Sequence, residues 1–281
     1  MTNERSDRPP LHFKKMHGLG NDFVIIDQRT AGWPLDADLV RAIGDRHRGV
    51  GFDQLAEIRQ GGNVAAELIF WNADGSTAGA CGNATRCVAD LLMAQTGEAS
   101  LALRTERGVL PCLRCADGLI QVDMGPPLLD WTEVPLAREV DTTCLPLEGQ
   151  PASCSMGNPH CTFFVDDVDA IDLEARGAAI EHDLLFPERT NVQFVQVLSR
   201  SEAKVRVWER GVGVTLASGS SSCAVLVNAA RRGLMDRQAV LHLEGGDIDI
   251  HWREDDHVLM AGPVAYVFDG IFDPRFIGAS R

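Results

Sequence analysis

Two short stretches of the sequence each place a small reactive or polar side chain directly before a predicted helix. The first is GACGNATRCVADLLMAQTG, which carries Cys81, and the second is LASGSSSCAVLVNAARRG, which carries Ser218. Backbone N–H groups without helical partners, together with the helix dipole, favour negative charge at a helix N-terminus. We therefore expect this position to favour the thiolate form of Cys81, and the neighbouring amides to hold a carboxylate or phosphate.

Taken alone, Cys81 is more simply interpreted as a small buried residue at a helix start. The second turn changes this balance, because Ser218-Gly219-Ser220 takes the local place of Cys81-Gly82-Asn83. Two helix N-termini that converge on one ligand would form an electropositive cradle. Two acid–base groups across it would remove a proton from one face of a carbon and return one to the other face, which inverts a stereocentre. We expect Cys87 and Cys223, inside the two helices, to be structural.

The composition narrows the class of protein. The chain has 281 residues, 45% of them hydrophobic and 23% charged, which suits two globular domains of about 130 to 140 residues each. Its formal net charge of −14 disfavours a nucleic-acid partner, because phosphate binding needs a basic face. No apolar run approaches the ~20 residues of a membrane helix. The polar start MTNERSDRPP lacks the apolar centre of a secretory signal, so we expect a disordered lead over 1–10 and a cytoplasmic protein whose cysteines stay reduced.

The two turns need a body of strands to position them, and the rest of the sequence supplies it. We predict a strand, glycine loop and strand in LHFKKMHGLGNDFVIID, a helix over 36–49, strands in QLAEIRQ and AAELIFWN, and a helix over 82–96. Similar themes recur after the proline-rich segment that starts at Gly125, with a second helix in DAIDLEARGAAIEHD. The order predicts an α+β protein of two similar halves, with domains over 11–127 and 128–263 and the end, 264–281, returning to the first.

Eight motifs in a fixed order resemble the diaminopimelate epimerases, the cofactor-independent amino-acid epimerases of lysine and peptidoglycan biosynthesis. The resemblance runs from about Leu11 to Phe272. Its motifs are KMHGLGNDFVIID, GFDQL, FWNADGS, CGNATRC, GNPHCTFFV, RTNVQFV, WERGVGVT and SGSSSCA. It implies two pseudo-symmetric domains, each a strand-rich, barrel-like body around a main helix, with the active site in the cleft between them. It also implies a small amino-acid substrate, no cofactor, no metal, and a homodimer.

The resemblance also assigns roles to individual residues. Cys81 matches the first catalytic cysteine, and His160 and Glu209 match residues that support proton transfer. The expected substrate-binding residues are Asn21, Gln54, Asn72, Gly82, Asn83, Asn158, Asn191, Glu209, Arg210, Gly219 and Ser220. Of these, Gly219 and Ser220 would hold the α-carboxylate, while Glu209 and Arg210 would face the distal end of the substrate.

These roles suit the chemistry. An amino-acid α-proton is a very weak acid, and the sequence carries no pyridoxal-lysine signature that would supply an electron sink. Preorganised amides in a dry site must then stabilise the anionic transition state. A substrate with a second amino-acid head needs buried amides, an Arg and a Glu to recognise it, since an unpaired polar group there would penalise the wrong substrate.

Ser218 departs from the family pattern, which has its second catalytic cysteine at this position. A hydroxyl is a far weaker acid than a thiol and is barely ionised without a partner base. Three explanations remain open: an epimerase that uses Ser218 with help from His160 or Glu209, a substrate-binding form that inverts slowly, or a paralogue with one strong base that acts on another amino acid as a racemase or eliminase.

Several of the same residues also have purely structural interpretations. Asn21 and Asn72 lie in glycine-bearing turns, where Asn is common for backbone reasons. His160 could cap a loop, and Glu209-Arg210 could be a surface pair. Cys112-x-x-Cys115 resembles half of a zinc site or a redox pair, but no second CxxC is present. The glycines of HGLGND fit neither a P-loop nor a dinucleotide fingerprint. A non-catalytic protein that keeps a binding cleft is the remaining class.

Overall fold

The computed structural model describes residues 10–30 and 33–279. Apart from Pro10, the lead predicted over 1–10 lies outside the described residues. Packing divides the chain into two units. Unit 1 contains the described residues up to 18, residues 22–120 and those from 264 onward, and unit 2 contains residues 19–21 and 121–263.

The division falls at Ile120/Gln121, earlier than the expected boundary at 127/128. The reason lies in the hydrogen bonds of the segment after Ile120. The Met124 N–H donates to the carbonyl of Val258 (2.9 Å), and the Val258 N–H donates to that of Gly125 (3.0 Å). These residues are therefore already part of the sheet of unit 2, although the proline-rich segment follows them.

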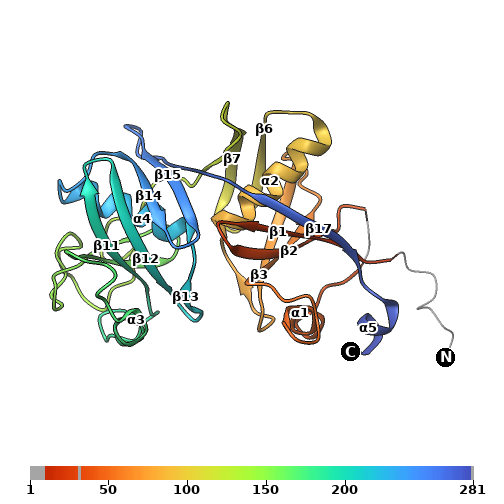
Figure 1. Cartoon of the computed structure of the whole chain (residues 1–281), viewed down its shortest axis with the longest axis horizontal. Coiled ribbons are helices and arrows are strands. Elements are labelled where there is room, and N and C mark those ends of the chain that lie inside the picture. The colour runs from red at the N-terminus through yellow and green to blue at the C-terminus, as the bar shows by residue number, and fades with distance from the viewer. Residues whose placement is uncertain (1–9, 31–32, 280–281) are drawn as a thin grey trace. The chain divides into compact units, whose positions relative to one another are not determined.

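Unit 1 is built from eight strands and three helices among the described residues (Figure 1). Strand β17 pairs antiparallel with β1, and β1 pairs with β2. Strand β2 runs parallel to β3, which is antiparallel to β4. Strand β4 pairs with β5 and runs parallel to β6, and β6 pairs antiparallel with β7. The elements are β1 (His12–Gly18), β2 (Asn21–Asp27), α1 (Ala37–Gly44), β3 (Gln54–Arg59), β4 (Ala66–Asn72), β5 (Thr77–Ala78), α2 (Gly82–Thr96), β6 (Ser100–Thr105), β7 (Gly108–Arg114), β17 (Ala265–Ile271) and α5 (Pro274–Ala279).

The two main helices of unit 1 have clear start and stop signals. Helix α2 has the predicted bounds and is buried along most of its length; it ends at Gly97, whose left-handed φ of 77° suits glycine. Helix α1 starts at the Asp36 cap, but it ends at Gly44, so the prediction of a helix to residue 49 is wrong at its C-terminal end. The carboxylate of Asp45 accepts the backbone N–H groups of the next residues, which turns the chain away from the helix.

Unit 2 has nine strands and two helices among the described residues. Strand β9 is antiparallel to β10, which runs parallel to β11; β11 is antiparallel to β12, which pairs with β13 and runs parallel to β14, and β14, β15 and β16 follow antiparallel, with β8 against β16. The elements are β8 (Ile120–Asp123), β9 (Ala152–Ser155), β10 (Pro159–Phe164), α3 (Leu173–Glu181), β11 (Asn191–Ser199), β12 (Glu202–Glu209), β13 (Gly213–Thr215), α4 (Gly219–Arg231), β14 (Gln238–Leu243), β15 (Gly246–Trp252) and β16 (Val258–Gly262).

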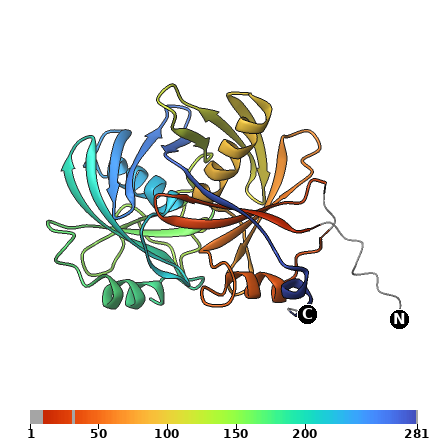
Figure 2. The ribbon, with the colours of Figure 1, turned by 45° about the vertical axis from the view of Figure 1, so that its right-hand side comes forward.

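The two units repeat one order of elements. In unit 1 the order is β2-α1-β3-β4-β5-α2-β6-β7, and in unit 2 it is β10-α3-β11-β12-β13-α4-β14-β15, with the same parallel and antiparallel pairings. Within each unit the longest helix is largely buried, and the shorter α1 or α3 lies at one end of the strands (Figure 2). The predicted α+β class with two pseudo-symmetric halves is confirmed.

Candidate active site

Cys81 is the N-cap of α2 and is half-buried. Its Sγ accepts the backbone N–H of Ala84 at 3.4 Å, and its carbonyl accepts the N–H and the hydroxyl of Thr85 at 2.9 and 2.8 Å. No acidic side chain lies in the first turn of the helix. The thiol therefore lies at the electropositive end of α2, as the sequence predicts, and takes up one of the amides that have no helical partner.

Gln54 and Asn72 are brought together by the pairing of β3 with β4, in which they lie directly opposite each other. The Gln54 amide donates to Asn72 Oδ1 at 3.0 Å, and the Asn72 amide donates to Ser76 Oγ at 3.0 Å. Strand β5 then folds back on β4 and leads to Cys81. One continuous stretch of unit 1 thus carries three of the predicted site residues.

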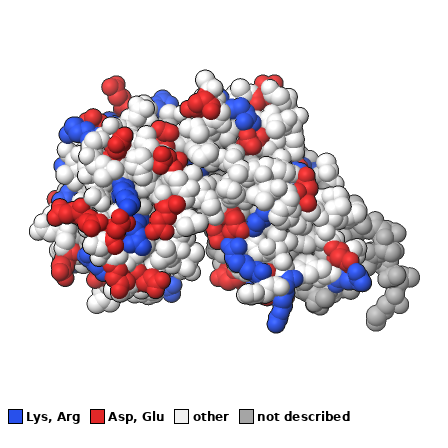
Figure 3. Space-filling model, in the orientation of Figure 1, with Lys and Arg blue, Asp and Glu red and all other residues white. Residues whose placement is uncertain are grey.

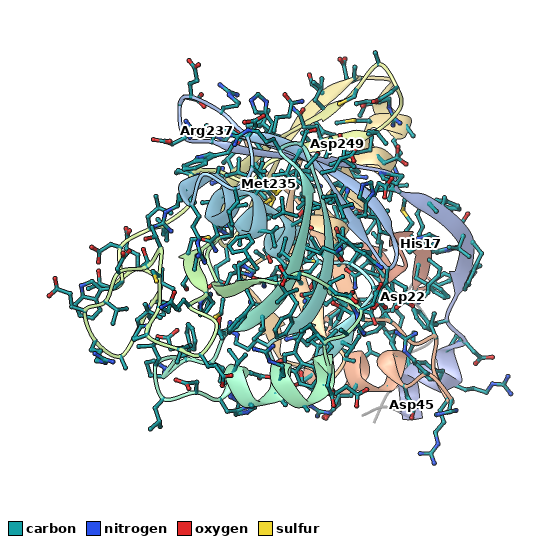
Figure 4. All side chains as sticks on the ribbon, turned by 60° about the vertical axis from the view of Figure 1, so that its left-hand side comes forward. His17, Asp22, Asp45, Met235, Arg237 and Asp249 are labelled. Carbon is teal, nitrogen blue, oxygen red and sulfur yellow. The ribbon has the colours of Figure 1, made fainter. Side chains whose placement is uncertain are left out.

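A cluster of charged side chains fixes the backbone beside Asn21 and Gln54. The N–H of Asp22 donates to Asp53 Oδ2 and the N–H of Asp53 donates to Asp22 Oδ1, both at 3.1 Å. Arg46 Nη2 donates to both carboxylates, at 2.7 and 2.8 Å, and Lys15 also binds Asp22. Figure 4 labels Asp22 and, at the end of α1, Asp45, the residue before Arg46. We call Lys15, Asp22, Arg46 and Asp53 the charged clamp.

The charges of the clamp act on the ionisation of Asp22. Burial alone raises the pKa of the Asp22 carboxyl, but hydrogen bonds from Arg46 and Lys15 and the charges of both groups outweigh burial, so the net shift of the pKa is downward. The carboxylate form therefore holds the start of β2 and the start of β3 in place.

Ser218 is the N-cap residue of α4 and is 4% exposed. Its side chain makes no capping hydrogen bond to α4; instead, its Oγ donates to Glu209 Oε2 at 3.0 Å. Serine is among the preferred N-cap residues, so this orientation is set by the carboxylate and not by local helix geometry. It leaves the first amides of α4 without a side-chain cap and gives the hydroxyl a base to which it can pass its proton.

Asn158 and His160 lie at the start of β10, close to the first turn of α4. His160 is fully buried, and its Nε2 lies 2.9 Å from Asn158 Oδ1. The Asn158 amide in turn points at Ser220 Oγ, at 3.5 Å. Two of the predicted site residues of this motif are therefore in contact with each other, and one of them reaches the predicted carboxylate-binding turn.

Asn191 occupies the first position of β11, where the parallel register places it beside His160. Its amide donates to the carbonyl of Pro159 and its Oδ1 accepts the N–H of Arg210, each at 3.0 Å. The Arg210 guanidinium donates to the carbonyl of Glu188 at 2.9 Å. Asn191 thus ties the start of β10 to the turn after β12 and fixes where Arg210 lies.

The predicted site residues of the two units occupy equivalent positions. Phe23 pairs with Gln54 as His160 pairs with Asn191, and Gln54 faces Asn72 as the β11–β12 register brings Asn191 beside Glu209. Each equivalent pair differs by 137 in residue number. The pairs are Asn21 and Asn158, Gln54 and Asn191, Asn72 and Glu209, Cys81 and Ser218, Gly82 and Gly219, and Asn83 and Ser220.

Comparison with known proteins identifies the family. The profile of the diaminopimelate epimerase family matches residues 13–129 and 152–267. The chain belongs to the diaminopimelate epimerase family. Relatives named diaminopimelate epimerase from Acidiphilium cryptum and Rhodospirillum centenum are 51% and 52% identical to it, over 94% and 92% of this chain and 97% and 91% of theirs. A solved structure of a Bacillus anthracis phenazine biosynthesis protein, PhzF family, has the same fold, with a TM-score of 0.69, 14% identity, and coverage of 94% of this chain and 99% of that one.

The cysteines of this family member differ in environment. Burial raises the pKa of the thiols of Cys87 and Cys161 far above the ordinary value and that of Cys154 to about 12, so these three stay protonated at neutral pH. Cys112 is buried on β7, and Cys115 lies in the turn that follows. Cys87 and Cys223 are buried inside α2 and α4 as predicted.

Two broader features of the chain bear on partners. Among the described residues no group of His, Cys, Asp and Glu is arranged to hold a metal ion, and no described helix is long and apolar enough to span a membrane. On the face shown in Figure 3, the described acidic and basic side chains are interspersed.

Sequence reasoning missed two groups of residues around the candidate site. The charged clamp was one, although Asp22 and Asp53 directly adjoin the predicted residues Asn21 and Gln54. Gln193 was the other; it is fully buried in β11 and contacts His160. A signal was present, because Gln193 is a polar residue in the otherwise apolar run VQFV and lies on the same strand face as Asn191.

Proposed function

We propose that this chain is a diaminopimelate epimerase, an isomerase that interconverts the LL and meso forms by proton transfer on opposite faces of one α-carbon. The repeated half-site carries the proposal: each unit presents an acid–base group at a helix N-terminus, Cys81 in one and the Ser218–Glu209 pair in the other. A two-base inversion needs one such group on each face. The relatives that bear the name diaminopimelate epimerase over nearly the whole chain support the choice of substrate.

The proton transfers balance when Ser218 and Glu209 act as one unit. In one direction the Cys81 thiolate takes the α-proton, the Ser218 hydroxyl delivers a proton to the other face, and the Glu209 carboxylic acid restores the serine proton. In the reverse direction the Glu209 carboxylate takes the serine proton while Ser218 Oγ takes the α-proton, and the Cys81 thiol delivers its proton to the opposite face, which restores the thiolate. Glu209 thereby supplies the base that a hydroxyl lacks by itself.

The remaining predicted residues would bind the substrate. Uncapped amides at Gly219 and Ser220 suit the α-carboxylate, where the helix dipole stabilises the charge that develops on loss of the α-proton. Amides of Gly82 and Asn83 at the N-terminus of α2, and the side chains of Asn21, Gln54 and Asn158, are the other expected binding groups. Asn72, Asn191 and Arg210 would recognise the distal amino-acid head. The reaction as written requires no cofactor and no metal.

The test is incubation of the purified chain with LL-diaminopimelate in D₂O. We expect deuterium at the α-carbon together with the meso isomer. Because Ser218 is a weaker acid–base group than cysteine, a second candidate is an enzyme that uses Cys81 as its one strong base. Deuterium incorporation without inversion would identify that enzyme. Saturable binding in calorimetry with neither exchange nor product would instead identify a non-catalytic binding protein and contradict the proposal.

We also propose that the enzyme is a cytoplasmic homodimer that pairs through β17. This strand pairs with β1, and four of its apolar side chains are 45–61% exposed, namely Tyr266, Val267, Phe268 and Ile271. Exposed apolar strands of this kind invite pairing with another chain, and antiparallel pairing of a strand with its own copy satisfies two-fold symmetry. Light scattering should give a dimer mass for the natural chain and a monomer mass for Val267→Asp; a natural monomer would refute this.

A further inference from the structure

A continuous hydrogen-bond network in unit 2, buried at its centre and half-buried at both ends, connects the last turn of α4 with its first turn. It begins at Arg231, whose Nη1 donates to Asn228 Oδ1 at 3.3 Å and to the Ser153 carbonyl at 2.9 Å. The Asn228 amide donates to Thr162 Oγ1 at 3.0 Å. Arginine has only donors, so the Asn228 atom that faces it must be the oxygen, and the Asn228 atom that faces Thr162 must be the nitrogen.

The donor and acceptor roles that Arg231 imposes on Asn228 also determine those of Thr162 and Gln193. Thr162 accepts from Asn228, so its own hydroxyl hydrogen is available to Gln193 Oε1, 3.0 Å away. The Gln193 amide nitrogen then faces both His160 Nδ1, at 3.0 Å, and Ser221 Oγ, at 3.1 Å. Both hydrogens and the oxygen of the Gln193 amide are used, and the residue is 0% exposed. Turning this amide over would leave the Thr162 hydroxyl without its acceptor, because Thr162 already accepts from Asn228.

The two ring nitrogens of His160 have fixed donor and acceptor roles in the same network. Because its Nδ1 accepts from Gln193, the proton of the neutral ring lies on Nε2, which donates to Asn158 Oδ1. Asn158 must then present its amide nitrogen to Ser220 Oγ. This last contact, at 3.5 Å, is the longest of the chain, so a carboxylate oxygen at the N-terminus of α4 would be a stronger acceptor for the same amide.

We propose that Gln193 is a positioning residue that holds His160 as its Nε2–H tautomer and thereby aims the amide nitrogen of Asn158 at the N-terminus of α4. The role of Asn158 toward substrate rests on the proposed function, whereas the tautomer does not. In this arrangement His160 orients Asn158, which is a proposed binding group. Arg231, at the opposite end of α4, determines which atom donates in each hydrogen bond of the network. Buried chains of this kind are stabilised when every member is satisfied.

The equivalent positions of unit 1 support a specific role over a general need of the fold. The counterparts of His160, Thr162, Gln193, Ser221 and Asn228 are apolar and buried; they are Phe23, Ile25, Ala56, Ala84 and Leu91. The same arrangement of strands and helix is therefore built without any such hydrogen-bond network, so the fold itself does not require polar groups at these places.

The test is ¹⁵N NMR of the imidazole of His160 in the full chain, assigned among the eight histidines by comparison with His160→Gln. We expect a protonated Nε2 and an unprotonated Nδ1 in the natural chain. Gln193→Glu keeps the shape of the side chain but places an acceptor at Nδ1, so Nδ1 should become protonated. Gln196→Glu, on the same strand outside the chain of bonds, is the matched control and should leave the ring unchanged.

Activity provides the second readout. Gln193→Glu and Gln193→Leu should raise KM for diaminopimelate about tenfold or more, the effect of losing one well-placed hydrogen bond to a charged group, with a smaller change in kcat. An Nδ1–H tautomer in the natural chain, or an unchanged ring in Gln193→Glu, would overturn the proposal without any assay. A changed ring with an unchanged KM would overturn the role of Asn158. The expected ring states in a chain without epimerase activity would support the tautomer and refute the proposed function.

Discussion

The turns at Cys81 and Ser218 have the same backbone plan and opposite hydrogen-bond behaviour. Cys81 Sγ accepts an amide of its own helix, whereas Ser218 Oγ donates to Glu209 and leaves its helix uncapped. The position of Glu209 is held in unit 1 by Asn72, which has no charge. The comparison teaches that equal backbone positions do not give equal chemistry: the hydroxyl has a carboxylate as proton acceptor, whereas the thiol accepts an amide from the first turn of its own helix.

The two half-sites also differ in the interactions that hold their predicted binding residues in place. In unit 1 the charged clamp fixes the backbone beside Asn21 and Gln54. In unit 2 the counterparts of Asp22 and Asp53 are Pro159 and Thr190, and a hydrogen-bond network through Gln193, with Arg231 as its one charged member, does the positioning. Equivalent backbones thus hold equivalent residues by different electrostatic means.

The largest expected effect comes from removing the thiol. Cys81→Ala should lower the rate of epimerisation by about 10³- to 10⁴-fold, because it removes the acid–base group proposed for that face. The rate of meso formation and the α-deuterium content measure it. Cys144→Ala, at an exposed cysteine, is the control and should keep full activity; equal loss in both variants would show that the effect is not specific to the turn.

Making the two turns alike should raise activity. We expect Ser218→Cys to increase kcat by about 10²-fold or more, since a thiol gives up its proton far more readily than a hydroxyl. Steady-state kinetics on LL-diaminopimelate would measure the gain. A lower rate in Ser218→Cys would mean that this site has adapted to oxygen and that the comparison of the two turns needs another explanation.

Removing the Glu209 carboxylate should lower kcat more when residue 218 is serine than when it is cysteine. Glu209→Gln should lower kcat by about 10²-fold in the natural chain and by clearly less in the Ser218→Cys background, because a thiol depends less on a neighbouring base. Glu202→Gln, at the exposed start of the same strand, should change neither. If Glu209→Gln costs the same in both backgrounds, Glu209 does not act through Ser218.

The smallest effect concerns the clamp of unit 1 and is one of stability. Asp22→Asn should lower the free energy of unfolding at pH 7 by about 1–3 kcal/mol, the size expected for hydrogen bonds to charged groups. The pKa of Asp22 is lowered in the folded protein, so its contribution is fully present above the ordinary aspartate pKa and is lost as the pH falls through the folded value.

Denaturant unfolding from pH 7 to pH 2 would check this. The difference between Asp22→Asn and the natural chain should shrink toward zero at the acid end. Asp166→Asn, at an exposed aspartate of unit 2, serves as the control and should show little difference at any pH. A difference that stays constant over the whole range would mean that the ionisation of Asp22 contributes nothing.

The sequence by itself determined the parts of the fold that depend on local rules. The bounds of α2 followed from its small-residue start and its glycine stop, the strands from their apolar patterns, and the likeness of the Cys81 and Ser218 turns from their spacing alone. The eight motifs also predicted the family. These features could be read without a structure because each depends on residues close together in the chain.

Only the tertiary structure decided which side chains meet. Strand pairing brings Gln54 to Asn72 and carries Asn191 beside His160; it also places Gln193 between His160 and α4. The division at Ile120/Gln121 likewise depends on hydrogen bonds between Met124–Gly125 and Val258, which the local sequence does not specify. The physical reason is the same throughout: the direction of a buried hydrogen bond is fixed by all the partners of both groups, and those partners come from strands and helices far apart in the sequence.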